Sequence, residues 1–535
     1  MNASEIRRIG RRAAVTVVAT GLAGSLLAVA APSASAGQTV PLVAWRSCPA
    51  YSEQTLELLA PPDKQPQLRE LLGRLECGTV SVPLDYRHPH GRQITVALTR
   101  LKARDQAHRL GSMALNPGGP GGSGYLMPVD VLVRGDATAG LNERYDLIGF
   151  DPRGVGYSTK VNCTPGDQPD QPPPGPVTED YARRIYDAQV AALAACGRSD
   201  PAFLGQLTTA NVARDLDRIR AGLGESRLNF LGISWGTWLG VVYRTLFPHQ
   251  VGRMFLDSVA IPRFSIPAFQ QGRIEAAERN AGRLTAWLAE HDDTYGLGGT
   301  AADVRAAIIA LRADYDANPR RFTDLPMPLD GSLIATAAAQ NAPVWPLVGR
   351  ILAELRDATG PTAPPTVKEV LGGPDEPPST PPADAPERSN RTMNKAAFCN
   401  EDPSRSDFAT AWAAYQQNLA RNPMTGRTLD FSAGCAGWPL PVQAFRIRPG
   451  GGSLVLSGHP WETPSPYEWT LQTRAIVGGT LYTVDDDVHG SALMECTADV
   501  IGFFDTGRID GGCPGVPVPA SVPTGPAATA QFSRI

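Results

Sequence analysis

The stretch that decides the fold is "LNFLGISWGTWLGVVY", residues 228–243. Its first part is an apolar run that predicts a β-strand, and its last part is an apolar run that predicts an α-helix. Ser234 stands between them, two residues away from Gly232 on one side and from Gly236 on the other. A glycine-x-serine-x-glycine sequence between a strand and a helix is a nucleophile elbow, a tight turn that lifts a serine hydroxyl above a sheet. Ser234 is therefore the candidate nucleophile.

The rest of the chain predicts an α/β fold, a mostly parallel sheet with helices on both faces. Short strands are expected at 93–103, 112–119, 145–154, 253–259, 452–458 and 479–486. Between residues 262 and 448 the pattern changes to helical periodicity, as in "AAERNAGRLTAWLAEH" at 276–291. This block is therefore interpreted as a helical insertion that divides the core into residues 37–261 and 449–535. Within it, the proline-rich run at 372–390 predicts a loop.

The first 36 residues have the pattern of a secretory signal peptide. Four arginines precede an apolar run, and "APSASA" at 31–36 ends in the small-x-small pattern that a signal peptidase cuts. We expect a secreted, extracellular protein that begins at Gly37, exported by the general or the twin-arginine route. An uncleaved membrane anchor is the alternative. No other stretch reaches the roughly 18 apolar residues of a membrane span, so no membrane association is expected after cleavage.

Removing residues 1–36 takes away four arginines and one glutamate, which changes the net charge from −4 to −7. An acidic balance of this kind gives no electrostatic reason to expect nucleic acid as a partner. We expect a monomer.

Eight cysteines in an exported chain predict disulfides. A zinc site is the alternative, but the sequence contains neither a C-x-x-C pair nor a nearby histidine cluster. Eight cysteines allow about 105 pairings. Pairing each cysteine with its neighbour in sequence would close the shortest loops: Cys48 with Cys77, Cys163 with Cys196, Cys399 with Cys435, and Cys496 with Cys513. No metal and no organic cofactor is implied.

A serine hydroxyl needs a base, and in the strand-elbow-helix topology the order is nucleophile, acid, histidine. The histidines that follow Ser234 are His249, His291, His459 and His489. His489 comes directly after the last predicted strand on a glycine-bearing loop, so it is the candidate base. His459 is the competitor, but the adjacent Pro460 and Trp461 suggest a loop residue packed on the surface.

The acid should follow the strand at 452–458, where "HPWETPSP" offers Glu462. Its carboxylate would hold the tautomer of His489 and stabilise the imidazolium. Asp485, Asp486 and Asp487 are alternatives by proximity in sequence. They share the strand end and loop of the histidine, and we interpret them as a solvated turn or a cap.

An oxyanion hole requires two backbone N–H donors. The glycine-rich run "LNPGGPGGSGY" at 115–125 follows a predicted strand and would let backbone amides approach a ligand. The expected donors are the N–H groups of Trp235 and Gly119. A phosphate-binding loop is the alternative, but the G-K-[ST] ending is missing and no basic residue is near.

In this order and spacing, "LNPGGPGGSG", "FDPRGVGYST", "LGISWGTWLG" and "VDDDVHG" resemble the α/β-hydrolase serine aminopeptidases. The likeness is to the secreted tripeptidyl aminopeptidases of the prolyl-aminopeptidase group, and "WRSCP", "LECGTVSVPLDY" and "FCNED" to "GCAGWP" extend it over nearly all the mature chain. It implies Ser234 as nucleophile, His489 as base, and Gly119 with Trp235 as oxyanion donors. The family usually has an aspartate in a G-x-x-D-x-x-T-P loop, where this chain has "GHPWETPSP" and Glu462.

The resemblance also implies that the helical insertion is a cap that encloses the free N-terminus of a peptide substrate. Glu401 and Asp402, beside Cys399, would bind the ammonium group; the alternative is two solvated surface carboxylates. The predicted function is a serine exopeptidase that releases short peptides, tripeptides in particular. An esterase, lipase or amidase could use the same triad. A catalytically silent binding protein would have lost the serine or the histidine.

Overall fold

The computed structural model describes residues 43–163, 173–372 and 380–520. The predicted signal segment and residues 373–379 of the proline-rich loop lie outside these ranges. Searched over the same three ranges, the structure contains no helix that is long and apolar enough to cross a membrane.

One mixed sheet forms the centre of the described chain, in the order β1-β2-β3-β5-β4-β6-β7-β8-β9-β10. The pairs from β1 through β2 and β3 to β5 are antiparallel, and every pair from β5 to β10 is parallel. The strands are β1 (Ala44–Arg46), β2 (Glu76–Pro83), β3 (Gln93–Leu101), β4 (Gly111–Asn116), β5 (Tyr145–Phe150), β6 (Leu228–Ile233), β7 (Val251–Asp257), β8 (Ser453–Gly458), β9 (Thr480–Val484) and β10 (Gly512–Cys513). The predicted parallel α/β sheet is confirmed.

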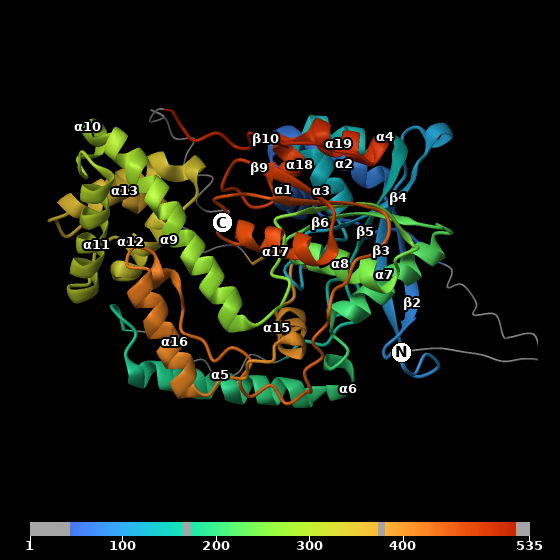
Figure 1. Cartoon of the computed structure of the whole chain (residues 1–535), viewed down its shortest axis with the longest axis horizontal. Helices are drawn as coiled ribbons and strands as arrows, with labels where there is room; N and C mark the ends of the chain where they lie inside the picture. Colours follow the sequence, from blue (N-terminus) through green and yellow to red (C-terminus); the bar gives the residue numbers. More distant parts are fainter. Residues whose placement is uncertain (1–42, 164–172, 373–379, 521–535) are drawn as a thin grey trace, which may run out of the picture. The chain divides into compact units, whose positions relative to one another are not determined.

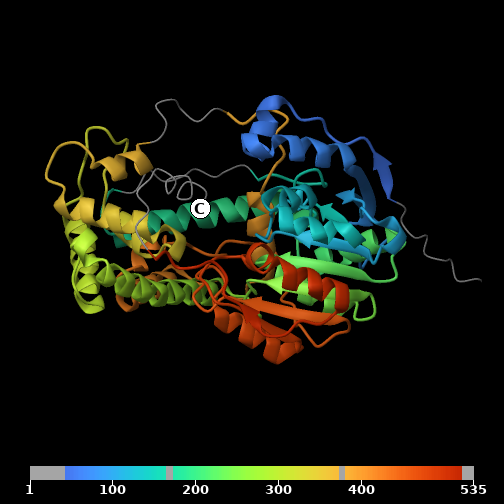
Figure 2. The same ribbon diagram turned by 90° about the horizontal axis from the view of Figure 1, so that it is seen from above.

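The central strands are apolar on both sides because helices cover both faces of the sheet (Figures 1 and 2). In β8, Leu454 and Leu456 belong to one buried cluster, and Val455 belongs to the cluster on the other face. Helices α7 and α8 contribute to the first cluster, and helices α2, α3 and α19 contribute to the second. The core helices are α1 (Glu53–Leu59), α2 (Gln65–Arg74), α3 (Met127–Arg134), α4 (Leu141–Arg144), α5 (Glu179–Ser199), α6 (Pro201–Leu204), α7 (Thr209–Gly222), α8 (Trp235–Leu246), α17 (Tyr467–Val477), α18 (Ala492–Glu495) and α19 (Thr497–Thr506).

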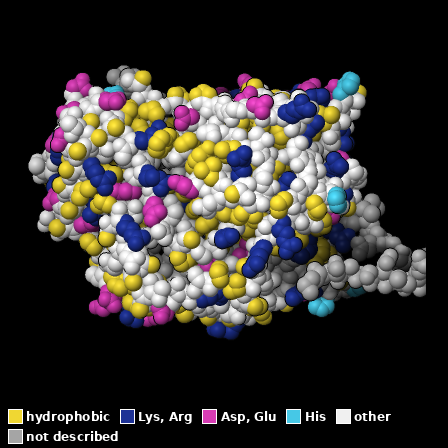
Figure 3. All heavy atoms as spheres, in the orientation of Figure 1, with side chains coloured by type: hydrophobic (Ala, Val, Ile, Leu, Met, Phe, Trp, Pro, Cys, Tyr) yellow, Lys and Arg dark blue, Asp and Glu magenta, His cyan; other side chains and the backbone are white. Residues whose placement is uncertain are grey.

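A helical segment separates β7 from β8, and most of it lies beside the sheet (Figure 1). Its helices are α9 (Ile266–Glu290), α10 (Asp292–Tyr295), α11 (Ala301–Ala317), α12 (Gly331–Ala338), α13 (Trp345–Asp357), α14 (Pro365–Leu371), α15 (Arg391–Glu401) and α16 (Phe408–Arg421). The second half of α9 and helices α11 to α14 bury a hydrophobic cluster of their own. On the face seen in Figure 3, charged side chains of both signs are interspersed.

Two helices cross the boundary that the sequence predicts between core and insertion. Helix α15 lies inside the insertion, yet Met393, Ala396 and Ala397 belong to the buried cluster of the sheet. Helix α5 precedes the insertion, yet Ala182 packs in one cluster with Phe408 of α16. Sequence order therefore does not separate the two parts completely, because apolar faces of α5 and α15 are buried across the boundary.

The structure contains four disulfides, and each joins neighbouring cysteines in sequence: Cys48–Cys77, Cys163–Cys196, Cys399–Cys435 and Cys496–Cys513. The third closes a loop of 36 residues and ties the end of α15 to the segment that leads to β8. Cross-links of this kind reduce the conformational entropy of the unfolded chain. The helix that carries Cys399 is thus fixed to the loop after α16.

Candidate active site

Ser234 occupies a strained turn between β6 and α8. Its backbone has φ 59° and ψ −126°, a conformation that a non-glycine residue rarely adopts. The turn is too tight for side chains on either side, since a Cβ atom at Gly232 would lie 2.6 Å from the carbonyl oxygen of Gly236. A Cβ atom at Gly236 would lie 2.6 Å from the carbonyl oxygen of Asn116. The geometry is that of a nucleophile elbow, and Ser234 lines a cavity above the sheet.

The glycine-rich loop after β4 lies directly against this turn. A Cβ atom at Gly118 would lie 2.8 Å from the Cβ of Ser234 and 3.0 Å from the backbone nitrogen of Trp235. Gly119 lines the same cavity as Ser234 and Trp235. Trp235 is the first residue of α8, and the first N–H groups of a helix have no partner within the helix. Both sequence-predicted oxyanion donors are therefore brought to the nucleophile.

Glu462 and His489 are in direct contact, with Nδ1 of the histidine hydrogen-bonded to Oε1 of the glutamate. The Glu462 side chain is fully buried in the loop after β8 and also accepts a hydrogen bond from the backbone N–H of Ser465 at 3.0 Å. About a third of the His489 side chain is exposed. This contact engages the Nδ1 edge of the ring, and Nε2 of His489 has no hydrogen-bond partner among the described residues.

The loop that carries His489 is anchored beside the nucleophile. The backbone N–H of Gly490 donates to Oγ of Ser258 at 2.8 Å. A Cβ atom at Gly490 would lie 2.9 Å from Cγ2 of Ile233, the residue before Ser234. The sequence thus brings a serine, a histidine and a carboxylate to the carboxyl ends of β6, β9 and β8, the edge at which open parallel sheets bind ligands.

The three aspartates at 485–487 do not contact His489. Asp487 accepts hydrogen bonds from Asn280 at 2.9 Å and from the backbone N–H of Ala342 at 2.8 Å. Asp485 is exposed, but Asp486 and Asp487 are 2% and 4% exposed. Of the predicted solvated turn or cap, the solvated turn is therefore wrong for Asp486 and Asp487, because partners distant in sequence bury both side chains.

His459 is completely buried, so the interpretation as a surface loop residue is wrong. Its Nε2 lies 2.9 Å from Oδ1 of Asp257, and its Nδ1 lies 2.6 Å from Oδ1 of Asp486. Burial lowers the pKa of His459, but the charge of Asp257 and the hydrogen bonds to both carboxylates outweigh it and raise the pKa well above its usual value. His459 is thus held between two acids, away from the cavity.

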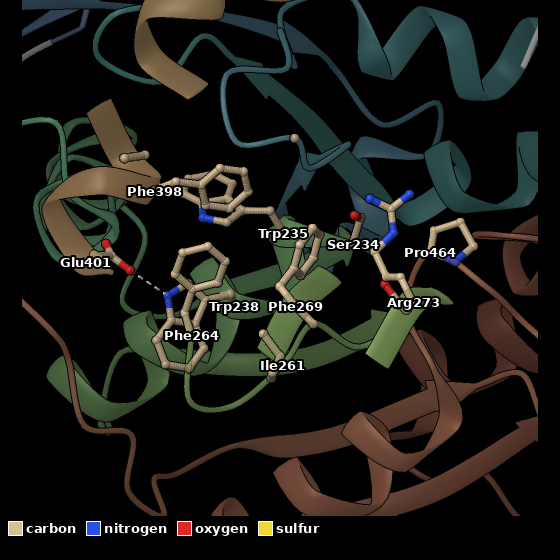
Figure 4. Close-up of a pocket in the computed structure, with 14 residues that line it drawn as sticks. Ser234, Trp235, Trp238, Ile261, Phe264, Phe269, Arg273, Phe398, Glu401 and Pro464 are labelled. Atoms are coloured by element: carbon tan, nitrogen blue, oxygen red, sulfur yellow. Dashed lines mark hydrogen bonds between the residues drawn. The ribbon is translucent and has the colours of Figure 1, made fainter. Parts of the chain in front are cut away.

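The cavity at Ser234 has a volume of about 210 Å³ and aromatic walls. In Figure 4 the aromatic rings lie between Glu401 and Ser234, and Arg273 and Pro464 lie on the far side of Ser234. The aromatic lining residues are Trp235, Trp238, Phe264, Phe269 and Phe398. The rings of Phe264 and Phe398 are stacked, with centroids 4.6 Å apart. Phe264, Phe269 and Phe398 come from the insertion, which therefore forms part of the cavity wall.

Glu401 reaches the cavity, and Asp402 does not. Oε2 of Glu401 accepts a hydrogen bond from Nε1 of Trp238 at 3.0 Å, the dashed line in Figure 4, and Oε1 accepts one from the backbone N–H of Thr209 at 2.7 Å. Burial raises the pKa of Glu401, although these two donors act in the opposite direction. The buried carboxylate of Asp402 instead binds the backbone N–H and hydroxyl of Ser404 at 2.9 and 2.7 Å.

Sequence reasoning missed the aromatic wall and the cation Arg273, which also lines the cavity. Phe264, Phe269 and Arg273 lie in or just before α9, at least 30 residues from the elbow. Their spacing of four and five residues was compatible with one side of a helix. No motif, however, indicated which side of the insertion would meet Ser234.

The chain matches known proteins over most of its length. A family model described as the alpha/beta hydrolase fold matches residues 112–286. Over 457 residues the chain is 31% identical to a tripeptidyl aminopeptidase of Streptomyces lividans, and the match covers 82% of each chain. It is 37% identical over 202 residues to the serine protease Hip1 of Mycobacterium tuberculosis, covering 37% of this chain and 38% of the relative. It is 34% identical over 212 residues to carboxylesterase B of the same species, covering 37% of each.

The long match and the geometry of the elbow agree. A relative at 31% identity matches 82% of this chain, and the α/β-hydrolase model covers the strand, elbow and helix around Ser234. The chain therefore belongs to the α/β-hydrolase family and is a serine hydrolase homologous to the tripeptidyl aminopeptidases.

Proposed function

We propose that the protein is a secreted serine exopeptidase that releases short peptides, tripeptides in particular, from the free N-terminus of peptide substrates. The observation that carries this proposal is that Ser234 and the buried carboxylate of Glu401 line one cavity, with aromatic rings between them. An apolar cavity with a carboxylate away from the nucleophile suits a peptide whose ammonium group enters first. The predicted signal segment and the four disulfides support export.

In the proposed reaction, Oγ of Ser234 attacks the carbonyl carbon of the scissile amide while His489 takes the hydroxyl proton. The N–H groups of Trp235 and Gly119 stabilise the oxyanion of the tetrahedral intermediate. His489 then gives its proton to the leaving amine as the C–N bond breaks, which leaves an acyl-enzyme on Ser234. Water, deprotonated by His489, hydrolyses the ester and regenerates the serine. Glu462 orients His489 and stabilises its imidazolium in both steps.

Glu401 is the proposed partner of the substrate ammonium group. Each of its oxygens already accepts one N–H group, but a carboxylate oxygen offers two lone pairs, so both can accept again. A cation in the cavity would also favour the ionised form of a carboxylate whose pKa burial has raised. Because Asp402 lies outside the cavity, the proposal assigns the ammonium group to Glu401 alone.

The test compares kcat/KM for Ala-Ala-Pro-anilide and its N-acetylated form, on the wild type and on Glu401→Gln and Asp402→Asn. Acetylation removes the charge that the carboxylate would pair with, a loss of roughly 2 to 5 kcal/mol for a desolvated pair, or some 30-fold or more. Glu401→Gln should abolish most of this discrimination, and Asp402→Asn should preserve it. Equal rates for the two peptides would overturn the exopeptidase proposal. Discrimination that persists in Glu401→Gln would place the ammonium site elsewhere.

An esterase, lipase or amidase is the second candidate, and the match to a carboxylesterase favours it. Such an enzyme would use the same serine and histidine without a requirement for a free amine. A p-nitrophenyl ester turned over faster than every free-amine peptide anilide would support it.

A further inference from the structure

A second cavity of about 340 Å³ adjoins the one at Ser234. The two share four lining residues, Phe264, Phe269, Arg273 and Phe398. The second cavity also contains Lys395, Asp430 and Thr463, and Thr463 follows the proposed catalytic acid directly. A substrate bound at Ser234 can therefore extend past the aromatic wall into a chamber whose charged groups come mostly from the insertion.

Arg273 has no carboxylate partner among the described residues, in contrast to two other arginines of α9. Arg279 pairs with Glu468 at 2.8 Å, and Arg283 pairs with Asp487 at 3.4 Å. The guanidinium of Arg273 lies over an aromatic face, 5.2 Å from the ring centroid of Phe269. Figure 4 shows it on the Ser234 side of the cavity. Its side chain is open to water, yet the surrounding protein lowers its pKa, and the charge of Glu462 acts in the opposite direction.

Lys395 is the second cation of this chamber. It lies on α15, and no side chain or carbonyl in the described part of the chain accepts a hydrogen bond from its ammonium group. The protein around it lowers its pKa by removing part of its water. Asp430 lines the same chamber but forms an ion pair with neither cation. The chamber thus has one more positive than negative charge, and both cations have donors available to a ligand.

We propose that Arg273 and Lys395 form a carboxylate-binding subsite in the chamber that adjoins the cavity of Ser234, and that the preferred substrates carry a carboxylate close to the scissile bond. A guanidinium presents a planar fork of donors that matches a carboxylate, and a partly desolvated cation regains favourable interactions when an anion binds. The carboxylate has two possible sources, the C-terminus of a short peptide or an acidic side chain. This subsite rests on the proposed peptidase function, and it favours short oligopeptides over intact proteins when the C-terminus is the source.

The experiment measures peptide binding by isothermal titration calorimetry to the Ser234→Ala protein, which cannot turn substrate over. Ala-Ala-Pro-Ala is compared with its C-terminal amide, and Ala-Ala-Pro-Glu-amide is compared with Ala-Ala-Pro-Gln-amide. At least one acid should bind about 10-fold or more tightly than its neutral counterpart, the factor expected for a charge-assisted hydrogen-bonded pair. Which of the two pairs shows the difference identifies the source of the carboxylate.

The preference should fall to within about twofold when Arg273→Gln or Lys395→Gln is added, and Arg273→Lys should retain part of it. Arg279→Gln is the matched control, because it removes a cation from the same helix at an exposed pair outside both cavities. Equal affinity for acids and neutral peptides, or a preference that survives both glutamine variants, would overturn the subsite.

Failure of the exopeptidase proposal gives a different result, namely equal binding of free and N-acetylated peptides. If no peptide binds at all, the wild-type enzyme is assayed with p-nitrophenyl acetate and mono-p-nitrophenyl succinate. Arg273→Gln should then lower kcat/KM for the succinate ester about 10-fold more than that for the acetate ester, and Arg279→Gln should leave the ratio of the two unchanged. An equal effect on both esters would contradict both the carboxylate subsite and the peptidase function.

Discussion

Nε2 of His459 lies 2.9 Å from Oδ1 of Asp257, so the ends of the neighbouring strands β8 and β7 are joined by a buried ion pair. The same imidazole meets Asp486 through Nδ1, and only the protonated ring can donate to both carboxylates. The backbone carbonyl of Asp257 accepts from the N–H of Ser234 at 3.1 Å. The backbone N–H of Val488, which precedes the proposed base, donates to Asp486 at 3.2 Å. His459 therefore holds together the two segments that carry the nucleophile and the base.

We predict that His459→Gln lowers the free energy of unfolding by about 3 to 5 kcal/mol near neutral pH, the cost of leaving buried charges without their partner. Because the folded-state pKa of His459 is raised, its contribution is complete below about pH 6.5 and is lost as the pH rises through the raised pKa. The pKa of Asp257 is lowered, since the charge and hydrogen bond of His459 outweigh its burial, so its contribution is lost as the pH falls through that lowered value.

Thermal unfolding of the two proteins between pH 5 and pH 10 checks this prediction. The difference in Tm between wild type and His459→Gln should be largest in the neutral range and should shrink towards alkaline pH. A difference that grows towards alkaline pH would contradict a charged His459.

Ser234→Ala should abolish hydrolysis while the fold is retained, because the hydroxyl is the group that becomes acylated. A triad nucleophile accounts for about 10⁶-fold in kcat. Turnover of an ester or anilide is measured beside the circular dichroism spectrum, and a fluorophosphonate probe should label the wild type but not the variant. Activity above a few per cent in a natively folded variant would exclude Ser234 as the nucleophile.

Glu462→Gln should lower kcat by on the order of 10³- to 10⁴-fold, since the amide keeps the shape of the side chain but not the charge that supports the imidazolium. Asp485→Asn is the control, because Asp485 is exposed at the start of the same loop as His489. Steady-state kinetics with one substrate compares the two variants. If Asp485→Asn loses all activity and Glu462→Gln stays active, the acid lies in the loop of His489 and not in the loop after β8.

Gly118→Ala should lower kcat by about 10²- to 10³-fold, the effect of losing one oxyanion donor. The new methyl group would lie 2.6 Å from the carbonyl oxygen of Ile233 and 2.8 Å from the Cβ of Ser234, so the loop must move away from the nucleophile. Gly73→Ala on α2 is the matched control, because nothing lies within 4 Å of its added methyl group. Comparable kcat values for the two variants would show that the glycine-rich loop does not form the oxyanion hole.

The sequence predicted the strands that bury both faces, because runs such as "SLVLSG" at β8 are apolar, short and bounded by glycine. It missed the eight-residue strand β2, and it also missed β1 and β10, which have three and two residues and lie at the edges of the sheet. Strands that short show no periodicity. Their pairing depends on β2 and β9, and nothing local to either segment indicates it.

The catalytic candidates could be located from sequence because the elbow and the loop order are local signals. The partners of His459 could not, since Asp257 is 202 residues away and Asp486 is 27 residues away. An adjacent proline and tryptophan suggested exposure, yet the sheet register brings the ends of β7, β8 and β9 together around the ring. Because three strands together bury His459, the sequence of no single strand indicates that burial.

The insertion has an inner part, α15, which packs in the buried cluster of the sheet. Its outer part, α11 to α14, has a hydrophobic cluster of its own. Helix α15 is fixed to the core by buried contacts and to the loop after α16 by the bond between Cys399 and Cys435, and it carries Phe398 and Glu401. Helices α11 to α14 share a cluster that includes none of the residues around Ser234. Substitutions in the outer helices should therefore change stability more than selectivity, because the insertion's cavity residues lie on α15 and in or just before the first turns of α9.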